Sequence, residues 1–592
     1  MKRLLSLGAV LALVVSGGSL VQGNASSGTD AQNPYGYQNA TTRIAGPQHW
    51  CGTNGITCAE PLANWEEFAG YDSSVAQGAH IAPYIGDDEP ATLFYSNTAG
   101  SGNDVTYKLA LPTDPPTTPT QDGSGGTDNF ELFPAFWFGM ILCDPNGSPN
   151  PDGQALTGHP TEPCVPDSNS NIHTSENPSS PNYFGLTPGQ AFMEMQFYPP
   201  GWVSWPAGIS CDPTLWCAAL NIDTFSENQN TGQFNNNHCL NSVGPEPVNF
   251  AFLTKDGVAT APASPAHPEH FTPDLTKDFL MGSGDQITLH MRDTNQGFKI
   301  SLNDATSGTQ GSMTASANNG FATVEFDPSA HACNVVPMDY HPMFSTSSLR
   351  TRVTAAAHTY NVSFSNEIGH FELCAKVADN AVGSCKKPLG FDTNDPDNSG
   401  LDPLGDDNFC LPGEASTLVK IGGCLDIDGD FDGVPYGHNW PGSISNPVAD
   451  ALLNPSPVRY TSPTTHGVNF TSMSFESDIS RNESSDTEFG AANPCQRHVL
   501  NPADPNPGFG CVNPPPHSQF YPIFSTIGLQ GTCWWQEGGS YIPGTLNTFG
   551  GSAKPEFGPL EPVHYPTAPY GTVTIRYNDF RRVLNSNPCK AG

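Results

Sequence analysis

The chain has 592 residues, of which 60 are glycine and 57 proline, so about one fifth of it consists of residues that interrupt helices and strands. A mainly helical or coiled-coil protein is therefore excluded. Only 14% of the residues are charged, yet 58 are Asp or Glu against 22 Lys or Arg, and the formal charge of -36 argues against a nucleic-acid-binding protein. The 33 Phe, 17 Tyr and 9 Trp supply enough apolar surface for a folded core, which argues against intrinsic disorder.

The N-terminus has the layout of a secretory signal peptide. Lys2 and Arg3 precede an apolar run from Leu4 to Val15, and small and polar residues follow. We therefore expect residues 1–23 to be a signal peptide and the protein to be secreted. No later stretch approaches the ~18–20 consecutive apolar residues that a membrane-spanning helix needs, so we expect no membrane span.

All 16 cysteines follow this segment, and an even number in an oxidising compartment predicts that they all pair, as eight disulfides. Zinc ligation is the weaker alternative, because the chain has no CxxC motif. Four short spacings suit disulfides that close local loops. They are Cys51 to Cys58, Cys211 to Cys217, Cys374 to Cys385 and Cys410 to Cys424.

Several segments have the pattern of β-strands. Two dense apolar runs, Phe133 to Cys143 and Phe192 to Trp202, are typical of buried strands. Apolar and polar residues alternate from Asp285 to Leu302 around a turn at residues 293–297, which predicts a hairpin. A second hairpin is predicted from Ser312 to Phe326 around Asn319-Gly320, since both turn residues must accept positive φ. Further strands are expected at His358 to Phe364 and Gly571 to Arg576, and one short helix at Asn446 to Leu453.

These elements predict a mainly β protein, an antiparallel β-sandwich or jelly roll with long loops, several disulfides and few helices. Changes in composition divide the chain into a signal peptide and five regions. They are 24–120, rich in loops; 121–265, rich in strands; 266–390, a sandwich domain; 391–440, with the acidic loops; and 441–592, again rich in strands.

Two acidic loops have the spacing of calcium sites. In the first, Asp395, Asp397 and Ser399 are followed by Gly400 and, at position twelve, by Asp406, as in an EF-hand loop. The second contains Asp426, Asp428, Asp430 and Asp432, with Gly433 at position six and the weaker ligand Asn439 at position twelve. The alternative is a solvated acidic turn. Both loops resemble the calcium loops of dockerins and of thrombospondin type 3 repeats, and the resemblance implies bound calcium with a structural role.

A second candidate site consists of histidines and carboxylates on strands. His370 and Glu372 share a face if this segment is extended, and His290, His341 and His358 lie on or near other predicted strands. Neutral imidazoles with one carboxylate would suit zinc, copper or iron. The alternative is that each histidine is a hydrogen-bonded residue of a sheet.

A third candidate is Glu194, which interrupts an apolar strand. Apolar surroundings favour the neutral form of a carboxyl group, which is what a general acid for glycoside cleavage requires. Glu367 or Glu372 would be its catalytic partner, and the aromatic segments Trp534 to Gly539 and Asn439-Trp440 could stack on sugars. The alternative is that Glu194 belongs to a buried polar network and that the tryptophans are core residues.

Other enzyme classes lack their motifs: the sequence has no G-x-S-x-G, H-E-x-x-H, phosphate-binding loop or dinucleotide fingerprint. Three segments, Met193 to Trp202, Tyr340 to Ser348 and Ser365 to Cys374, resemble a group of large secreted proteins of soil bacteria and fungi. This resemblance implies export and a disulfide-rich β fold, and it implies no particular activity.

We therefore expect a secreted, calcium-stabilised hydrolase that acts as a monomer on an extracellular polysaccharide or related polymer. Two alternatives stay open. One is a transition-metal enzyme, possibly oxidative, that uses the histidines; the other is a non-catalytic protein that binds a glycan or matrix.

The calcium loops give a direct prediction. A ligand bound only by the folded state stabilises that state by mass action, so excess EGTA should lower the melting temperature and added calcium should restore it. Calorimetry with and without EGTA measures the effect, and an unchanged melting curve would contradict the assignment of these loops.

Overall fold

The computed structural model describes the following residues: 71–72, 80–81, 91–96, 100–116, 129, 134–144, 164, 189–201, 211–224, 227–228, 233–234, 236, 238–239, 248–325, 327, 329–342, 362–366, 374–377, 385–388, 448, 452, 455–484, 498–499, 512–513, 523–525, 532–537, 547–549, 561–565, 573–584 and 586–589. Two ten-stranded antiparallel sheets make up most of this part, and the prediction of a mainly β, antiparallel sandwich is confirmed.

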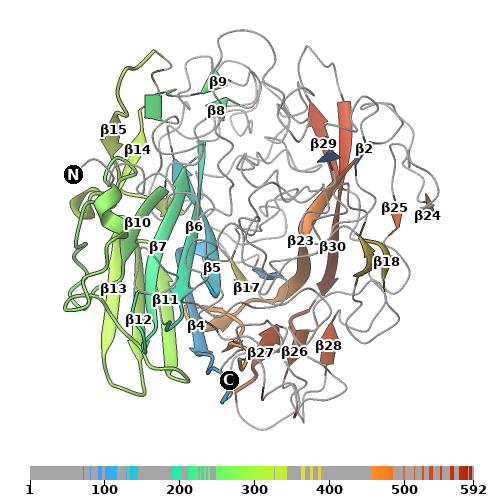
Figure 1. Cartoon of the computed structure of the whole chain (residues 1–592), viewed down its shortest axis with the longest axis horizontal. Coiled ribbons are helices and arrows are strands. Elements are labelled where there is room, and N and C mark those ends of the chain that lie inside the picture. Colours follow the sequence, from blue (N-terminus) through green and yellow to red (C-terminus); the bar gives the residue numbers. More distant parts are fainter. Residues whose placement is uncertain are drawn as a thin grey trace.

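The first sheet collects strands from residue 91 to residue 584, and Figure 1 shows it extending from β10 and β7 on the left to β23 and β30 on the right. In spatial order it contains β10 (Val248–Phe252), β7 (Cys217–Thr224), β6 (Gly189–Tyr198), β5 (Phe136–Asp144), β17 (Ser363–Asn366), β3 (Ala91–Tyr95), β23 (Ser472–Ser484), β30 (Val573–Leu584) and β29 (Glu561–Tyr565), with β16 (His341–Pro342) pairing with β5.

The second sheet is equally mixed in sequence. In spatial order it contains β13 (Gln310–Ala315), β12 (Phe298–Asp304), β11 (Gln286–Arg292), β4 (Asp104–Ala110), β20 (Arg459–Tyr460), β27 (Trp535–Glu537), β26 (Ile523–Ser525) and β28 (Asn547–Phe549), with β21 (Thr464–Thr465) pairing with β4 and β22 (Val468–Asn469) with β21.

Short elements complete the described part. Five two-stranded pairs are β1 (Tyr71–Asp72) with β2 (His80–Ile81), β8 (Glu227–Asn228) with β9 (Gln233–Phe234), β14 (Ala322–Val324) with β15 (Val335–Pro337), β18 (Cys374–Val377) with β19 (Cys385–Pro388), and β24 (His498–Val499) with β25 (Val512–Asn513). Three 3-10 turns are η4 (Ser101–Asn103), η9 (Pro268–Phe271) and η10 (Ala317–Asn319).

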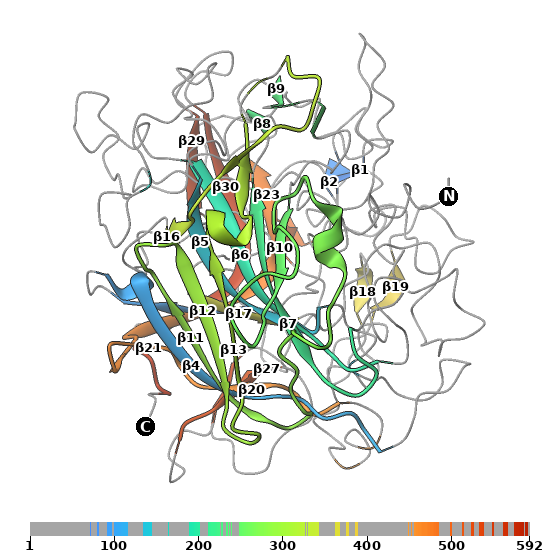
Figure 2. The ribbon, with the colours of Figure 1, turned by 90° about the vertical axis from the view of Figure 1, so that its left-hand side faces the viewer.

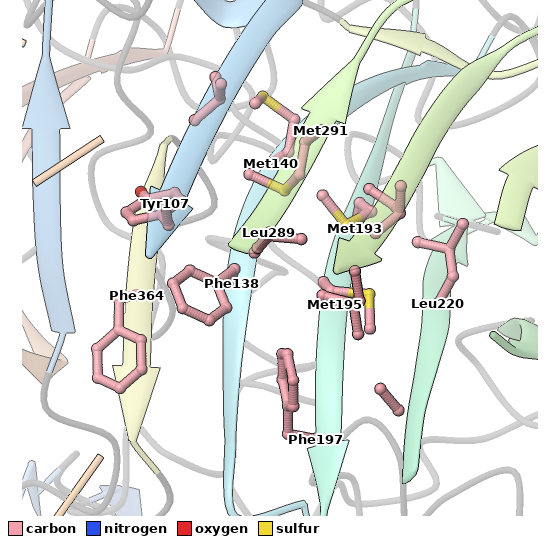
Figure 3. Close-up of a cluster of buried hydrophobic side chains, with 14 of the residues drawn as sticks. Tyr107, Phe138, Met140, Met193, Met195, Phe197, Leu220, Leu289, Met291 and Phe364 are labelled. Carbon is pink, nitrogen blue, oxygen red and sulfur yellow. The ribbon is translucent and has the colours of Figure 1, made fainter. Parts of the chain in front are cut away.

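The two sheets pack face to face around one apolar core, because every second side chain of each strand points inward. From the first sheet come residues such as Phe138, Met193 and Met195, and from the second come residues such as Leu289 and Met291 (Figure 3). Aromatic rings join the sheets directly. The ring of Phe364 on β17 stacks on Tyr460 of β20 with 4.0 Å between centroids, and Phe138 lies 4.7 Å from Tyr107.

The first predicted hairpin is confirmed. β11 and β12 pair antiparallel from Ile287 opposite Asp304 to Arg292 opposite Lys299, and Ile287, Leu289 and Met291 are buried. Gly297 in the turn has φ 107°, and a Cβ there would lie 2.2 Å from the carbonyl oxygen of Ala315. Only glycine fits this position, so the turn is held close to the end of β13.

The second predicted hairpin is wrong. β13 pairs with β12, whereas β14 pairs with β15, so the segments on either side of Asn319-Gly320 do not pair with each other. Gly320 does have the expected positive φ, 79°, but it ends the 3-10 turn η10. The turn chemistry was read correctly, and pairing with a more extended partner strand decided the topology.

Four disulfides lie in the described part: Cys143–Cys164, Cys211–Cys217, Cys239–Cys333 and Cys533–Cys589. The local Cys211–Cys217 pair matches the prediction from spacing. Every cysteine whose side chain is described is bonded. Among the described residues, no helix is long and apolar enough to cross a membrane.

One buried carboxyl group lies in a loop against the edge of the second sheet. Asp278 is 1% exposed; its Oδ2 accepts a hydrogen bond of 2.7 Å from the backbone N–H of Asp274, and its Oδ1 has no hydrogen-bond partner. Burial raises the pKa of Asp278 to about 7, against the opposing effects of the Asp274 N–H and of the Lys255 and Lys277 ammonium groups.

This raised pKa predicts a pH-dependent loss of stability. The folded state keeps a proton that the unfolded state releases near pH 4, so stability should be greatest below pH 4, fall by roughly 4 kcal/mol or less as pH rises to 7, and then level off. Asp278→Asn should remove this slope and raise the melting temperature at pH 8 by several degrees.

Thermal unfolding between pH 3.5 and 8 measures the effect. Asp256→Asn is the matched control, because a hydrogen bond from the Val258 N–H lowers the pKa of that exposed carboxyl group. Its loss should therefore act in the opposite direction at neutral pH. Parallel stability curves for wild type and Asp278→Asn would contradict the assignment.

Candidate functional site

Glu194 lies in the middle of β6, on the face of the first sheet that points away from the core. Its neighbours in sequence, Met193 and Met195, belong to the core, so alternation places Glu194 on the opposite face, which we call the outer face. The carboxyl group is 4% exposed. Glu194 pairs in register with Gly139 of β5 on one side and with Asn221 of β7 on the other.

Side-chain amides hold the Glu194 carboxyl group. Gln196 Nε2 donates to Glu194 Oε2 at 2.6 Å, and Asn221 Nδ2 lies at 3.5 Å from the same oxygen. Tyr198 OH in turn donates to Gln196 Oε1. The prediction that Glu194 interrupts an apolar strand is thus accompanied by a chain of buried polar groups, which fixes the direction of the carboxyl group.

Two buried hydroxyl groups lie in line with this chain. Ser363 of β17 pairs with Gly139, and Ser365 pairs with Trp137, which pairs in turn with Gln196. Both serines are 0% exposed, and neither hydroxyl oxygen has a hydrogen-bond partner in the described part of the chain. Gly139 contributes no side chain between Ser363 and Glu194. We refer to Glu194, Gln196, Asn221, Ser363 and Ser365 as the Glu194 row.

The Glu194 row has a cost that a purely structural role does not repay. A buried hydroxyl group without a partner costs ~1–3 kcal/mol, and buried polar groups in folded proteins almost always have a partner. A carboxyl group fixed by amide donors, with two open hydroxyl groups beside it, has the donors and acceptors that bind a polyhydroxylated ligand. It also has an acidic group that can exchange a proton with that ligand.

A second buried carboxyl group, Glu537, lies in the interior between the two sheets. It is 0% exposed, and Tyr460 OH donates to its Oε1 at 2.7 Å, as does Thr92 Oγ1 of the other sheet. The pKa of Tyr460 is raised well above its ordinary value, first by burial and then by the charge of Glu537. These contacts tie β3 to β20 and β27 inside the core, which makes Glu537 a structural residue.

The aromatic segment around Glu537 does not form a sugar-stacking surface as its sequence suggested. Trp535 is 0% exposed and its Nε1 donates to Ser462 Oγ at 2.9 Å, so it is a core residue. Trp534 is partly buried, and the Arg459 guanidinium lies over its ring, 5.8 Å from the centroid. Asn439 and Trp440 lie outside the described residues.

The two described histidines of the predicted metal site have separate carboxylate partners. His290 Nε2 lies 3.1 Å from Asp104 Oδ1, and His466 Nδ1 lies 3.3 Å from Asp104 Oδ2. His341 Nδ1 lies 2.8 Å from Asp293 Oδ1, and both of these side chains are buried. His466 was missed in the sequence; its φ of 48°, which is positive at no other described non-glycine residue, could not be read there.

In the described part, no three His, Cys, Asp or Glu side chains gather in a way that could hold a metal ion. The remaining candidates lie outside the described residues. They are Glu367, Glu372, His358, His370 and the calcium-loop residues Asp395, Asp397, Ser399, Asp406, Asp426, Asp428, Asp430 and Asp432.

Comparison of the chain with family models, with curated proteins and with solved structures finds no match in any of the three.

Proposed function

We propose that this protein is a secreted hydrolase that cleaves a polysaccharide or a related polymer, with Glu194 as the general acid. The observation that carries the proposal is the Glu194 row, in which a buried carboxyl group is held by Gln196 and lies in line with two buried hydroxyl groups without partners. Trp137, beside Gln196 and Ser365 on the same face, adds an aromatic surface of the kind that sugars stack on.

Glycoside cleavage needs a second carboxyl group, at about 5–5.5 Å in retaining enzymes and about 6.5–9.5 Å in inverting ones. Glu367 and Glu372 are our candidates. Glu367 follows directly after the last residue of β17, the strand that carries Ser363 and Ser365. We further propose that the two acidic loops, from Asp395 and from Asp426, bind calcium and stabilise the fold without taking part in the reaction. The described disulfides agree with an oxidising, extracellular environment.

The central test is Glu194→Gln, which keeps the shape of the side chain and removes its acidic proton. We expect the release of reducing ends from a panel of neutral and acidic polysaccharides to fall by about 100-fold or more, since general acid catalysis contributes roughly 10²–10⁴-fold. Glu537→Gln is the matched control, because it makes the same change at an equally buried glutamate inside the core. That variant should keep its activity per folded molecule.

Equal activity of Glu194→Gln and wild type on a polymer that the wild type cleaves would remove Glu194 from the mechanism. If the wild type cleaves no polymer of the panel, the hydrolase assignment itself fails. Melting curves of both variants check that the comparison is made on folded protein.

A second prediction separates ligand binding from folding. Ser363→Ala with Ser365→Ala removes two buried hydroxyl groups without partners, so the melting temperature should stay the same or rise. If these groups bind substrate, KM should rise about tenfold while kcat changes less, because one or two hydrogen bonds are lost. A lowered melting temperature with unchanged KM would indicate that both serines serve the fold alone.

A further inference from the structure

The outer face of the second sheet, on the opposite side of the sandwich from the Glu194 row, carries a group of basic residues. Figure 2 looks onto β4, β11, β12 and β13, with strands of the first sheet behind them. Alternate residues of these four strands are buried, and the others point outward. The outward set is mostly hydroxyl- and amide-bearing: Thr106, Thr288, Ser301, Asn303, Gln310, Ser312 and Thr314.

Four cations stand on this face: Lys108 on β4, Arg292 on β11, Lys299 on β12 and Arg459 on the adjoining β20. We refer to them as the basic face. Lys108, Arg292 and Arg459 are exposed, and Lys299 is partly exposed. The only carboxyl group among the outward residues of these strands is Asp104. In a chain with 58 acidic and 22 basic residues, a face with four cations and one anion is a strong local reversal of charge.

None of the four cations makes an ion pair within the described part of the chain. Arg292 and Lys299 even stand directly opposite each other in register, an arrangement of like charges that destabilises a sheet. Asp104, opposite Arg292 on its other side, is engaged by His290 and His466 instead.

Lysines away from this face are treated differently. Lys277 Nζ pairs with Asp274 Oδ2 at 3.4 Å, and Lys255 Nζ donates to the carbonyl oxygen of Thr276 at 3.3 Å. Unpaired cations are therefore a property of the basic face and not of the described lysines in general.

We propose that the basic face binds an acidic polysaccharide. Guanidinium groups match carboxylates in a two-point geometry, and the hydroxyl and amide side chains between the cations can bond to sugar hydroxyl groups. The negative charge of the rest of the chain opposes the dense charge of a nucleic acid. A membrane surface is also disfavoured, because β4, β11, β12 and β13 present no exposed large apolar side chain.

This surface would hold the protein on a charged polymer independently of any reaction at Glu194. The proposal does not depend on the hydrolase assignment, since it needs only reversible binding. It gives the expectation of a polymer partner a specific chemistry, a carboxylate-bearing chain, and a specific place, the exposed face of the second sheet.

The experiment measures binding of the full-length protein to polygalacturonate, with the fully methyl-esterified polymer as the uncharged comparison. We expect saturable binding to the charged form alone, weakening as salt is raised from 50 to 500 mM. Arg292→Gln with Lys299→Gln should weaken binding by about tenfold, the effect of losing two exposed charge contacts of ~1 kcal/mol each. Lys255→Gln with Lys277→Gln removes the same charge elsewhere and should bind as wild type does.

Several outcomes would overturn the proposal. Equal weakening by both double variants would mean that only net charge matters. Equal binding of the esterified polymer would remove the role of the carboxylates. Tighter binding to duplex DNA or to phosphatidylserine vesicles would assign the face to another partner, and a dimer at low salt that Arg292→Gln with Lys299→Gln abolishes would assign it to a second copy. Glu194→Gln should bind polygalacturonate normally, which separates this test from that of the hydrolase.

Discussion

The fold depends on the contact between the inward faces of two large sheets. Neither sheet is stable alone, since each exposes a continuous apolar surface on one side, and burial of a Phe, Leu or Met side chain gives roughly 1.5–3 kcal/mol. The rings of Phe138 and Phe364 from one sheet and of Tyr107 and Tyr460 from the other meet at its centre. Once these faces are joined, alternation along each strand fixes which residues are left for the outside.

That constraint makes the polar residues on the strands informative. Glu537, Thr92 and Tyr460 are polar groups inside the core, and they bond to one another across the sheets. Ser363 and Ser365 are equally buried without that compensation. The cations of the second sheet differ again, because they are in contact with water and lack carboxylate partners. The three groups correspond to holding the fold together, to chemistry, and to attachment.

The sequence was informative where a segment's structure is decided locally. The apolar run that became β5 and the alternation that became β11 and β12 were predicted correctly, because burial of one or both faces leaves its period in the residues. Glu194 stood out for the same reason. The Asn319-Gly320 turn misled because β13 had a longer register available with β12. Partners of functional groups were beyond sequence reasoning: His290 and Asp104 are 186 residues apart, and Thr92 and Glu537 are 445 apart.

The position of β3 has a consequence for how the molecule is made. This strand, at residues 91–95, lies between β17 at residues 363–366 and β23 at residues 472–484, and β4 likewise waits for β11 and β20. A chain that emerges with its N-terminus first therefore carries unpaired strand edges until most of it has been synthesised. Contacts of such long range make folding slow and expose the intermediate to aggregation. The late Cys533–Cys589 disulfide then locks segments that arrive last, so assembly of both sheets belongs to the end of synthesis and not to its course.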